Sequence, residues 1–176
     1  MSSETEIIEP GVLKTPKPSR KLKISDIVIF TVLAVVIILL TVTLVSKLNL
    51  KHEVAQAKVV ADKVVHDMSK QNTAGIRALG DKKFQADHTA AELSTALTFK
   101  TTPPITFSQL YGDSKPTVDR QIVANNSRGQ HVAIVYRYDK LKVPFFVRID
   151  TIKAPGTAQW HLQALSASQD EVSLLE

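Results

Sequence analysis

The sequence predicts an α+β protein with one transmembrane helix, followed by a small domain of about three helices packed on a curled antiparallel sheet of three to five strands. Three observations predict this class. An uncharged apolar run lies near the N-terminus, helical periodicity follows it, and the last part of the chain changes to the alternation of strands. We expect four segments, which are residues 1–24, 25–48, 49–169 and 170–176.

The predicted transmembrane helix depends on residues 27–45, IVIFTVLAVVIILLTVTLV, which contain no charged residue, glycine or proline. A helix rises about 1.5 Å per residue, so a run of this length crosses a hydrocarbon core of about 30 Å. We expect the chain to contact the lipid bilayer through residues 27–45. A buried core helix and a cleaved signal peptide are the alternatives. The length of the run and the charged Lys47 after it disfavour the signal peptide.

The residues before the run set the expected orientation. Residues 14–23 contain five basic side chains and no acidic one, so the N-terminus is expected in the cytoplasm and the domain of residues 49–169 on the other side of the cell membrane. Low apolar content and several prolines predict that residues 1–24 form a disordered basic tail. Residues 170–176 are expected to form a short C-terminal tail.

Composition excludes several kinds of site. The chain has no cysteine, which excludes disulfides, thiolate zinc sites and a cysteine nucleophile. Its net charge is +5, and most of this excess lies beyond the apolar run. A solvated surface of mixed charge explains such a mild excess, and attraction to an anionic surface is the alternative.

Helical periodicity begins just after the apolar run. Apolar residues recur at steps of three and four and predict a helix over residues 51–70. These residues are Val54, Ala57, Ala61, Val64, Val65 and Met68. Asn72-Thr73 predicts the start of a short helix over residues 74–79, with Gly80 in a left-handed position at its end. Thr89 and Glu92 form a capping box, which predicts a third helix over residues 90–97.

The later residues show strand periodicity. Residues 105–111 are expected to be an edge strand or a loop, and longer strands are expected over residues 117–124, 131–139, 143–152 and 159–167. Turn residues at 125–129 and 154–157 separate them. Alternation predicts two sets that each share one face of the sheet: Val132, Ile134, Tyr136 and Tyr138 in one strand, and Trp160, Leu162 and Ala164 in another.

The helical stretches VAQAKVVADKVVHDM, TAGIRALG and TAAEL, followed by the strands HVAIVYRYDK, VPFFVRIDTI and WHLQALSAS, carry a resemblance. In this order they resemble the cystatin-like or nuclear transport factor 2-like cone, in which a sheet curls around a long first helix. The resemblance covers residues 51–168. Many small bacterial anchored proteins have this layout. The inner-membrane assembly subunit of type IV secretion systems shares it too, although no motif of that family is found here.

The resemblance implies where an enzyme of this fold would hold an acid–base pair, which is inside the cone. Residue types suited to that role are His66, Asp67, Asp87, His88, Asp119, His131, Tyr136, Tyr138 and His161. Their spacing disfavours most of them, because neighbours on a helix do not share a face and the strand histidines alternate with apolar neighbours that pack inward. We therefore expect no catalytic, cofactor-binding or metal-binding residue, and no histidine pair has a helical zinc spacing.

Two further groups are interpreted as structural. Phe145, Phe146 and Trp160 are expected in the core. Arg137 and Arg148 lie near Asp139 and Asp150 and are expected to form cross-strand ion pairs on a sheet surface, with an anion-binding groove as the alternative. The sequence has no phosphate-binding loop, no nucleophile elbow and no aromatic–basic surface for nucleic acid.

These observations together predict a membrane-tethered binding or interaction module. Its partner is expected to be an envelope protein or a small ligand, and not a nucleic acid. A scaffold subunit of an envelope-spanning secretion machine, which would form homo-oligomers, is the first alternative. A cone-fold enzyme acting on a small apolar substrate is the second, and it requires an open apolar cavity.

Overall fold

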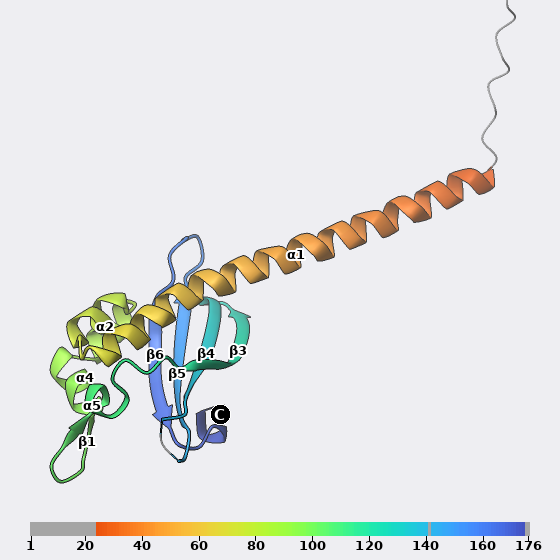
Figure 1. The fold of residues 1–176 in the computed structure, drawn as a ribbon. Helices are drawn as coiled ribbons and strands as arrows, with labels where there is room; N and C mark the ends of the chain where they lie inside the picture. The colour runs from red at the N-terminus through yellow and green to blue at the C-terminus, as the bar shows by residue number, and fades with distance from the viewer. Residues whose placement is uncertain (1–23, 141, 175–176) are drawn as a thin grey trace, which may run out of the picture. The chain divides into compact units, whose positions relative to one another are not determined.

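A computed structural model of the chain describes residues 24–140 and 142–174. The predicted tail therefore lies outside the described residues, except for Ile24. The fold is α+β, with a long first helix, several short helices and two antiparallel sheets, as the sequence predicts (Figure 1). The chain divides into two units, with the boundary between Val45 and Ser46. Each unit is described by itself.

Helix α1 (Ile24–Ser69) carries the apolar run in the first unit. It is the one helix in the described part of the chain that is apolar and long enough to cross a membrane, with a mean hydropathy of 2.4 and no buried residue in its most apolar window. Thr41 and Thr43 donate to the carbonyls of Ile37 and Leu39 at 2.8 and 2.7 Å, so these two hydroxyls are satisfied within the helix. This helix is compatible with a single-pass membrane anchor.

The second unit contains a four-stranded antiparallel meander in the order β3-β4-β5-β6. The strands are β3 (Thr117–Asn126), β4 (Gly129–Tyr138), β5 (Phe145–Lys153) and β6 (His161–Ser168). All four strands expected beyond residue 116 are thus present. Two of the turns between them need glycine, because Gly129 and Gly156 have positive φ values of 137° and 75°.

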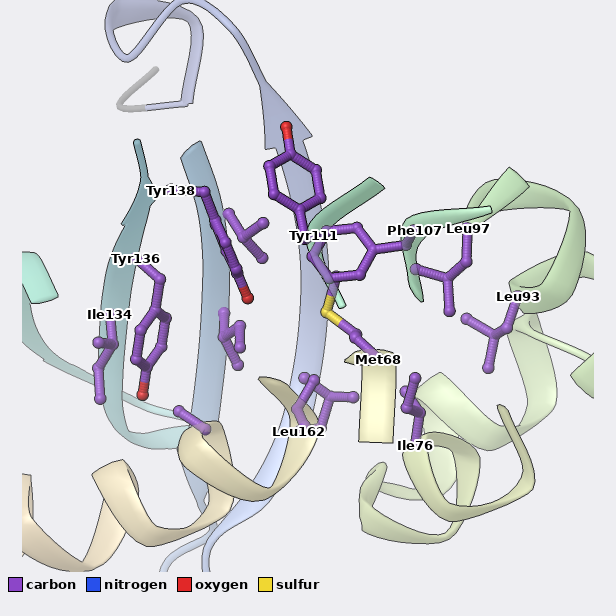
Figure 2. Packing of buried hydrophobic residues seen from close by; sticks show 14 of the residues in the cluster. Met68, Ile76, Leu93, Leu97, Phe107, Tyr111, Ile134, Tyr136, Tyr138 and Leu162 are labelled. Carbon is purple, nitrogen blue, oxygen red and sulfur yellow. The ribbon is translucent and has the colours of Figure 1, made fainter. Parts of the chain in front are cut away.

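One face of this sheet packs against residues 54–68 of α1. The predicted stripe of α1 supplies fully buried Ala57, Ala61, Val64 and Met68, and β4 supplies the four residues predicted to share a face. Figure 2 shows Met68 among side chains from the sheet and from the short helices. Small alanines on α1 allow the helix to approach the sheet closely, and larger side chains fill the space that remains.

The register of β6 corrects one prediction. Thr151 pairs with Leu162, but the next pair is Asp150 with Ala164, so Gln163 is an inserted bulge residue. The insertion reverses the alternation of side chains. Trp160 and Leu162 are buried as predicted, whereas Ala164 is exposed and Leu165 packs against the core in its place.

The short helices differ from the prediction in three places. Helix α2 (Thr73–Leu79) has Asn72 as its N-cap, but Gly80 after it is extended (φ −68°, ψ 151°) and not left-handed. Gly80 instead pairs with Leu162 in a single parallel bridge. Helix α3 (Lys82–Asp87), which the sequence analysis missed, follows at once and is capped by Asp81.

Helix α4 (Ala90–Ala96) opens with the predicted capping box of Thr89 and Glu92. Residues 105–111 were expected to be strand or loop, and only Ile105–Thr106 (β2) is strand, paired with Thr98–Phe99 (β1). Residues Phe107–Tyr111 form helix α5, because Thr106 and Gln109 make a second capping box. Phe107 and Tyr111 of α5 are buried against Tyr138 and Phe145.

The opposite face of the sheet carries a smaller core. Val135, Phe146 and Leu174 are buried together there, so the chain folds back over the sheet and ends, within the described residues, in the 3₁₀ helix η1 (Val172–Leu174). Arg148 donates to the carbonyl of Leu174, and Arg120 pairs with Glu171 at 2.9 Å. Residues up to Leu174 of the expected tail are therefore part of the domain.

Candidate functional site

The residues singled out as acid–base candidates do not converge on one cavity. Tyr138 is buried in the aromatic cluster, and Asp119 is an exposed bulge residue of β3. Asp67 is 6% exposed and accepts a hydrogen bond from the Asn72 amide at 3.0 Å, so it connects the end of α1 to the start of α2. Side chains of α1, the sheet and the short helices pack together in the interior.

The two strand histidines lie on the outer face of the sheet. His131 and His161 are both paired in register with Ile152, so they are two strands apart, about 10 Å between backbones. His131 is held between Gln163 and Asn126 at 2.9 and 3.0 Å. Both ring nitrogens of His131 therefore already have a side-chain partner. Across residues 24–140 and 142–174, no group of three histidine or acidic side chains has the arrangement of a metal site.

The two arginine–aspartate pairs form within strands and their extensions, not across strands as predicted. Arg137 pairs with Asp139 at 2.7 Å and Arg148 pairs with Asp150 at 2.9 Å, and in both cases the partners are two residues apart. Residues two apart on a strand point to the same face, which explains why each pair forms. Both arginines therefore already have carboxylate partners.

Two of the depressions in the second unit lie at opposite edges of the sheet. The first, the polar cleft, lies between α1, the loop after α5 and the start of β3, and has a volume of about 370 Å³. It brings together His66 and Tyr136 from the predicted candidates. It also contains two residues that the sequence analysis did not single out as candidates, Lys58 and Asp62.

Asp62 is the centre of the polar cleft. The Tyr136 hydroxyl donates to Asp62 Oδ1 at 2.6 Å, and the Lys58 ammonium donates to both carboxylate oxygens at 2.7 and 2.5 Å. Burial and the hydrogen bond to Asp62 raise the pKa of Tyr136, so Tyr136 is a neutral donor at physiological pH. Lys58, Asp62 and His66 are spaced four residues apart, and this spacing on one helix face was the signal in the sequence.

The second depression, the apolar groove, lies between α3, α4 and β6 and has a volume of about 520 Å³. Its floor consists of buried or half-buried apolar side chains, which are Met68, Phe84, Leu93, Leu97 and Leu165. Asp87, His88 and Glu92 line it as polar residues, and the backbone donor of Thr89 keeps the pKa of Glu92 below its usual value. Glu92 is therefore an anion at neutral pH.

Beside the apolar groove, β6 is an edge strand. On the side away from β5 it meets Gly80 in the parallel bridge at Leu162, where the Asp81 amide donates to the Leu162 carbonyl at 2.8 Å. From Leu165 to Ala167, where β6 lines the apolar groove, no further strand of the described chain pairs with it. An open strand edge next to an apolar groove is the arrangement with which domains bind extended peptides.

Comparison of the chain with protein-family models, with curated proteins and with solved structures finds no match.

Proposed function

We propose that this chain is a single-pass membrane protein whose second unit is an interaction module that binds an extended segment of another protein along the edge of β6. The observation that carries the proposal is the edge of β6 at residues 165–167, beside the apolar groove, where no strand of the described chain pairs on the side away from β5. In this proposal the N-terminus lies in the cytoplasm and the module lies outside, as the basic residues 14–23 favour.

The edge of β6 supplies the means of binding. An extended segment that pairs with this edge gains backbone hydrogen bonds and places alternate side chains into the apolar groove. The chain already begins such a pairing itself, at Gly80, but leaves the edge when α3 starts at Lys82. Asp87 and Glu92 line the same groove, so the segment bound there carries apolar residues next to a lysine or arginine.

The test uses the full-length protein in the membranes of its own cells. A photo-cross-linking amino acid replaces Ala96 or Ser166, which are exposed residues that line the apolar groove, or Lys63, an exposed residue of α1 that does not line it. We expect a discrete adduct from the two groove positions and none from Lys63. Mass spectrometry of the adduct is expected to identify an extended segment with apolar and basic residues.

A blocking variant provides the second part of the test. Ala167→Arg places a charge in the groove, whereas Ala124→Arg places the same charge on β3, the opposite edge strand, at an equally exposed alanine. We expect Ala167→Arg to abolish the adduct and Ala124→Arg to leave it. Equal adducts from Lys63, or equal loss in both variants, contradict the proposal. An adduct between two copies of this chain supports the scaffold alternative instead.

The membrane placement is tested separately. We expect the full-length protein to sediment with membranes and its C-terminus to be digested by protease added to intact cells. A C-terminus protected until the cells are lysed contradicts the proposed orientation, and a chain found in the supernatant contradicts the anchor.

A further inference from the structure

The polar cleft lies at the β3 edge of the sheet and takes no part in the interaction proposed for β6. Its walls are the exposed turns of α1 from Lys58 to Ser69, the loop of residues 113–116, and the side chains of Val118 and Tyr136. Each wall supplies polar groups. The nature of a ligand therefore depends on which charges of the polar cleft are already neutralised by partners within the protein.

The acidic groups of the cleft are neutralised. Asp62 accepts from the Lys58 ammonium with both oxygens and from the Tyr136 hydroxyl with one. Asp113 accepts from Lys70 at 2.9 Å, and this hydrogen bond keeps the pKa of Asp113 below its usual value. Both carboxylates are thus paired with a lysine ammonium, so neither is left open to a cationic ligand.

The basic groups of the cleft are not all used. An ammonium has three hydrogen-bond donors, and Lys58 directs two of them to Asp62, so one remains. Lys115 is exposed and forms no ion pair within residues 24–140 and 142–174. The ring of His66 lines the same space. The charge left for a ligand is therefore positive.

Apolar side chains restrict the ligand further. Val65, Pro116 and Val118 form one part of the lining beside the basic groups. A volume of about 370 Å³ accommodates a small molecule and not a folded partner. We propose that the polar cleft binds a small molecule that joins a carboxylate or phosphate group to a short apolar chain, with the anion held by Lys115 and the free donor of Lys58.

The experiment uses the full-length chain in detergent micelles and a fluorine label. Because the chain has no cysteine, a single Thr117→Cys substitution beside the cleft takes a trifluoromethyl tag selectively, and Gln159→Cys provides a distant exposed control. The tag is followed by fluorine NMR during titration with butyrate, butyl phosphate, inorganic phosphate or butylammonium. Butyrate and butyl phosphate distinguish a carboxylate from a phosphate ligand, and inorganic phosphate measures the anion without the apolar chain.

We expect a saturable shift of the Thr117→Cys label with butyrate or butyl phosphate, weaker binding of inorganic phosphate, and no saturable shift with butylammonium. Lys115→Met is expected to weaken binding about tenfold, the usual effect of losing one charged hydrogen bond. Lys100→Met removes an equally exposed lysine outside the cleft and is expected to leave binding unchanged.

Three results overturn this inference: no saturable shift with any of the anions, equal or tighter binding of butylammonium, or equal weakening by Lys115→Met and Lys100→Met. The last result means that the anion responds only to the overall charge of the protein. Ala167→Arg, the variant that blocks the β6 edge, is expected to leave anion binding intact, so failure of one proposal does not decide the other.

Discussion

The hydroxyl of Tyr136, on β4, donates a hydrogen bond of 2.6 Å to Oδ1 of Asp62, on α1. This bond joins the two layers of the second unit at the border between the apolar core and the polar cleft, and Figure 2 shows the ring of Tyr136 with its hydroxyl directed toward α1. The ring is 2% exposed, whereas the side chain of Asp62 is 49% exposed. A buried neutral group is thus satisfied by a solvated anion.

Tyr136→Phe is expected to destabilise the second unit by about 1.5 to 3 kcal/mol, because it removes a hydrogen bond to a charged acceptor. Tyr138→Phe is the matched control. It changes the same residue type two positions further along β4, on the same face, where the buried hydroxyl has no hydrogen-bond partner among residues 24–140 and 142–174. We expect Tyr138→Phe to be neutral or slightly stabilising, because the phenylalanine ring, unlike that of tyrosine, buries no hydroxyl that must give up its hydrogen bonds to water.

Thermal unfolding of the full-length protein in micelles, followed by circular dichroism, measures both changes. Equal loss in the two variants contradicts the role assigned to the bond between Tyr136 and Asp62.

The buried tyrosines also predict sensitivity to alkaline pH. Burial raises the pKa of Tyr111 to about 12 from its ordinary value of 10.0, and burial also raises the pKa values of Tyr136 and Tyr138. The folded state thus retains these protons while the unfolded chain loses them. Their contribution to stability is complete below pH 10 and is lost as the pH rises through the folded pKa values, from about 10 to beyond 12.

The variant Tyr111→Phe is expected to reduce this alkaline loss without lowering stability at pH 8, because the buried hydroxyl of Tyr111 has no hydrogen-bond partner in the described part of the chain. The measurement is the unfolding temperature of the parent and of Tyr111→Phe at a series of pH values between about 8 and 12. Parallel curves for the two proteins contradict the assignment.

The elements that the sequence predicted correctly are those with long periodic patterns. The stripe of α1 from Val54 to Met68 specifies a helix because its period is continued over several turns, and in β4 an apolar residue recurs at every second position from Val132 to Tyr138. The capping box of Thr89 and Glu92 was recognised because both members are present at the required spacing. Thr106 and Gln109 show the same spacing, but Ile105 and Phe107 favour a strand, so local propensity and the capping pattern disagree there.

The remaining differences depend on tertiary contacts. The bulge at Gln163 exchanges the roles of Ala164 and Leu165, and the local sequence contains no residue that requires it. Tyr136 is 74 positions from Asp62 in the chain. Only the packing of β4 on α1 brings the two side chains together and so forms the polar cleft. Asp62 is not one of the residues of the predicted α1 stripe, and the sequence alone does not show what it faces.

Gly80 provides a test of why glycine is required after α2. Its backbone is extended, so conformation alone permits an alanine there. A Cβ atom at this position would lie 2.4 Å from Cδ1 of Phe84, which is buried and 2% exposed. Gly80→Ala is therefore expected to destabilise the second unit by about 1 to 3 kcal/mol through displacement of the Phe84 ring.

Two further variants distinguish this cause from a backbone requirement. Gly80→Ala combined with Phe84→Leu is expected to cost less than the sum of the two single changes, because the ring that clashes is absent. Gly156 has a positive φ of 75°, and a Cβ added there meets no atom of the described chain within 4 Å. Gly156→Ala is therefore expected to lower the free energy of unfolding by about 1 to 2 kcal/mol through backbone conformation alone. Strict additivity of Gly80→Ala and Phe84→Leu contradicts the steric explanation.

Glu53 joins α1 to the strands at the other end of the sheet. It pairs with Lys153 and accepts a hydrogen bond from Trp160 Nε1 at 3.2 Å, and the Lys153 ammonium lies 5.6 Å from the Trp160 ring centre. The hydrogen bond from Lys153 is the main cause that lowers the pKa of Glu53 below 4.5. The pair therefore contributes stability above pH 4.5, and this contribution is lost as the pH falls through the folded pKa.

Glu53→Gln is expected to destabilise the second unit by about 1 kcal/mol at neutral pH, because the amide still accepts from Trp160 but no longer attracts Lys153. The difference between variant and parent is expected to shrink as the pH falls toward 3, where the glutamate is protonated as well. Trp160 is the one tryptophan of the chain, so its fluorescence reports unfolding and this contact together.

Asp87→Asn removes a carboxylate that lies 3.6 Å from the ammonium of Lys83 in an exposed pair, and it is expected to cost less than about 0.5 kcal/mol at every pH. A Glu53→Gln effect that is equally small, or that does not change with pH, contradicts the role assigned to the charge of Glu53, since only an ionised Glu53 can attract Lys153.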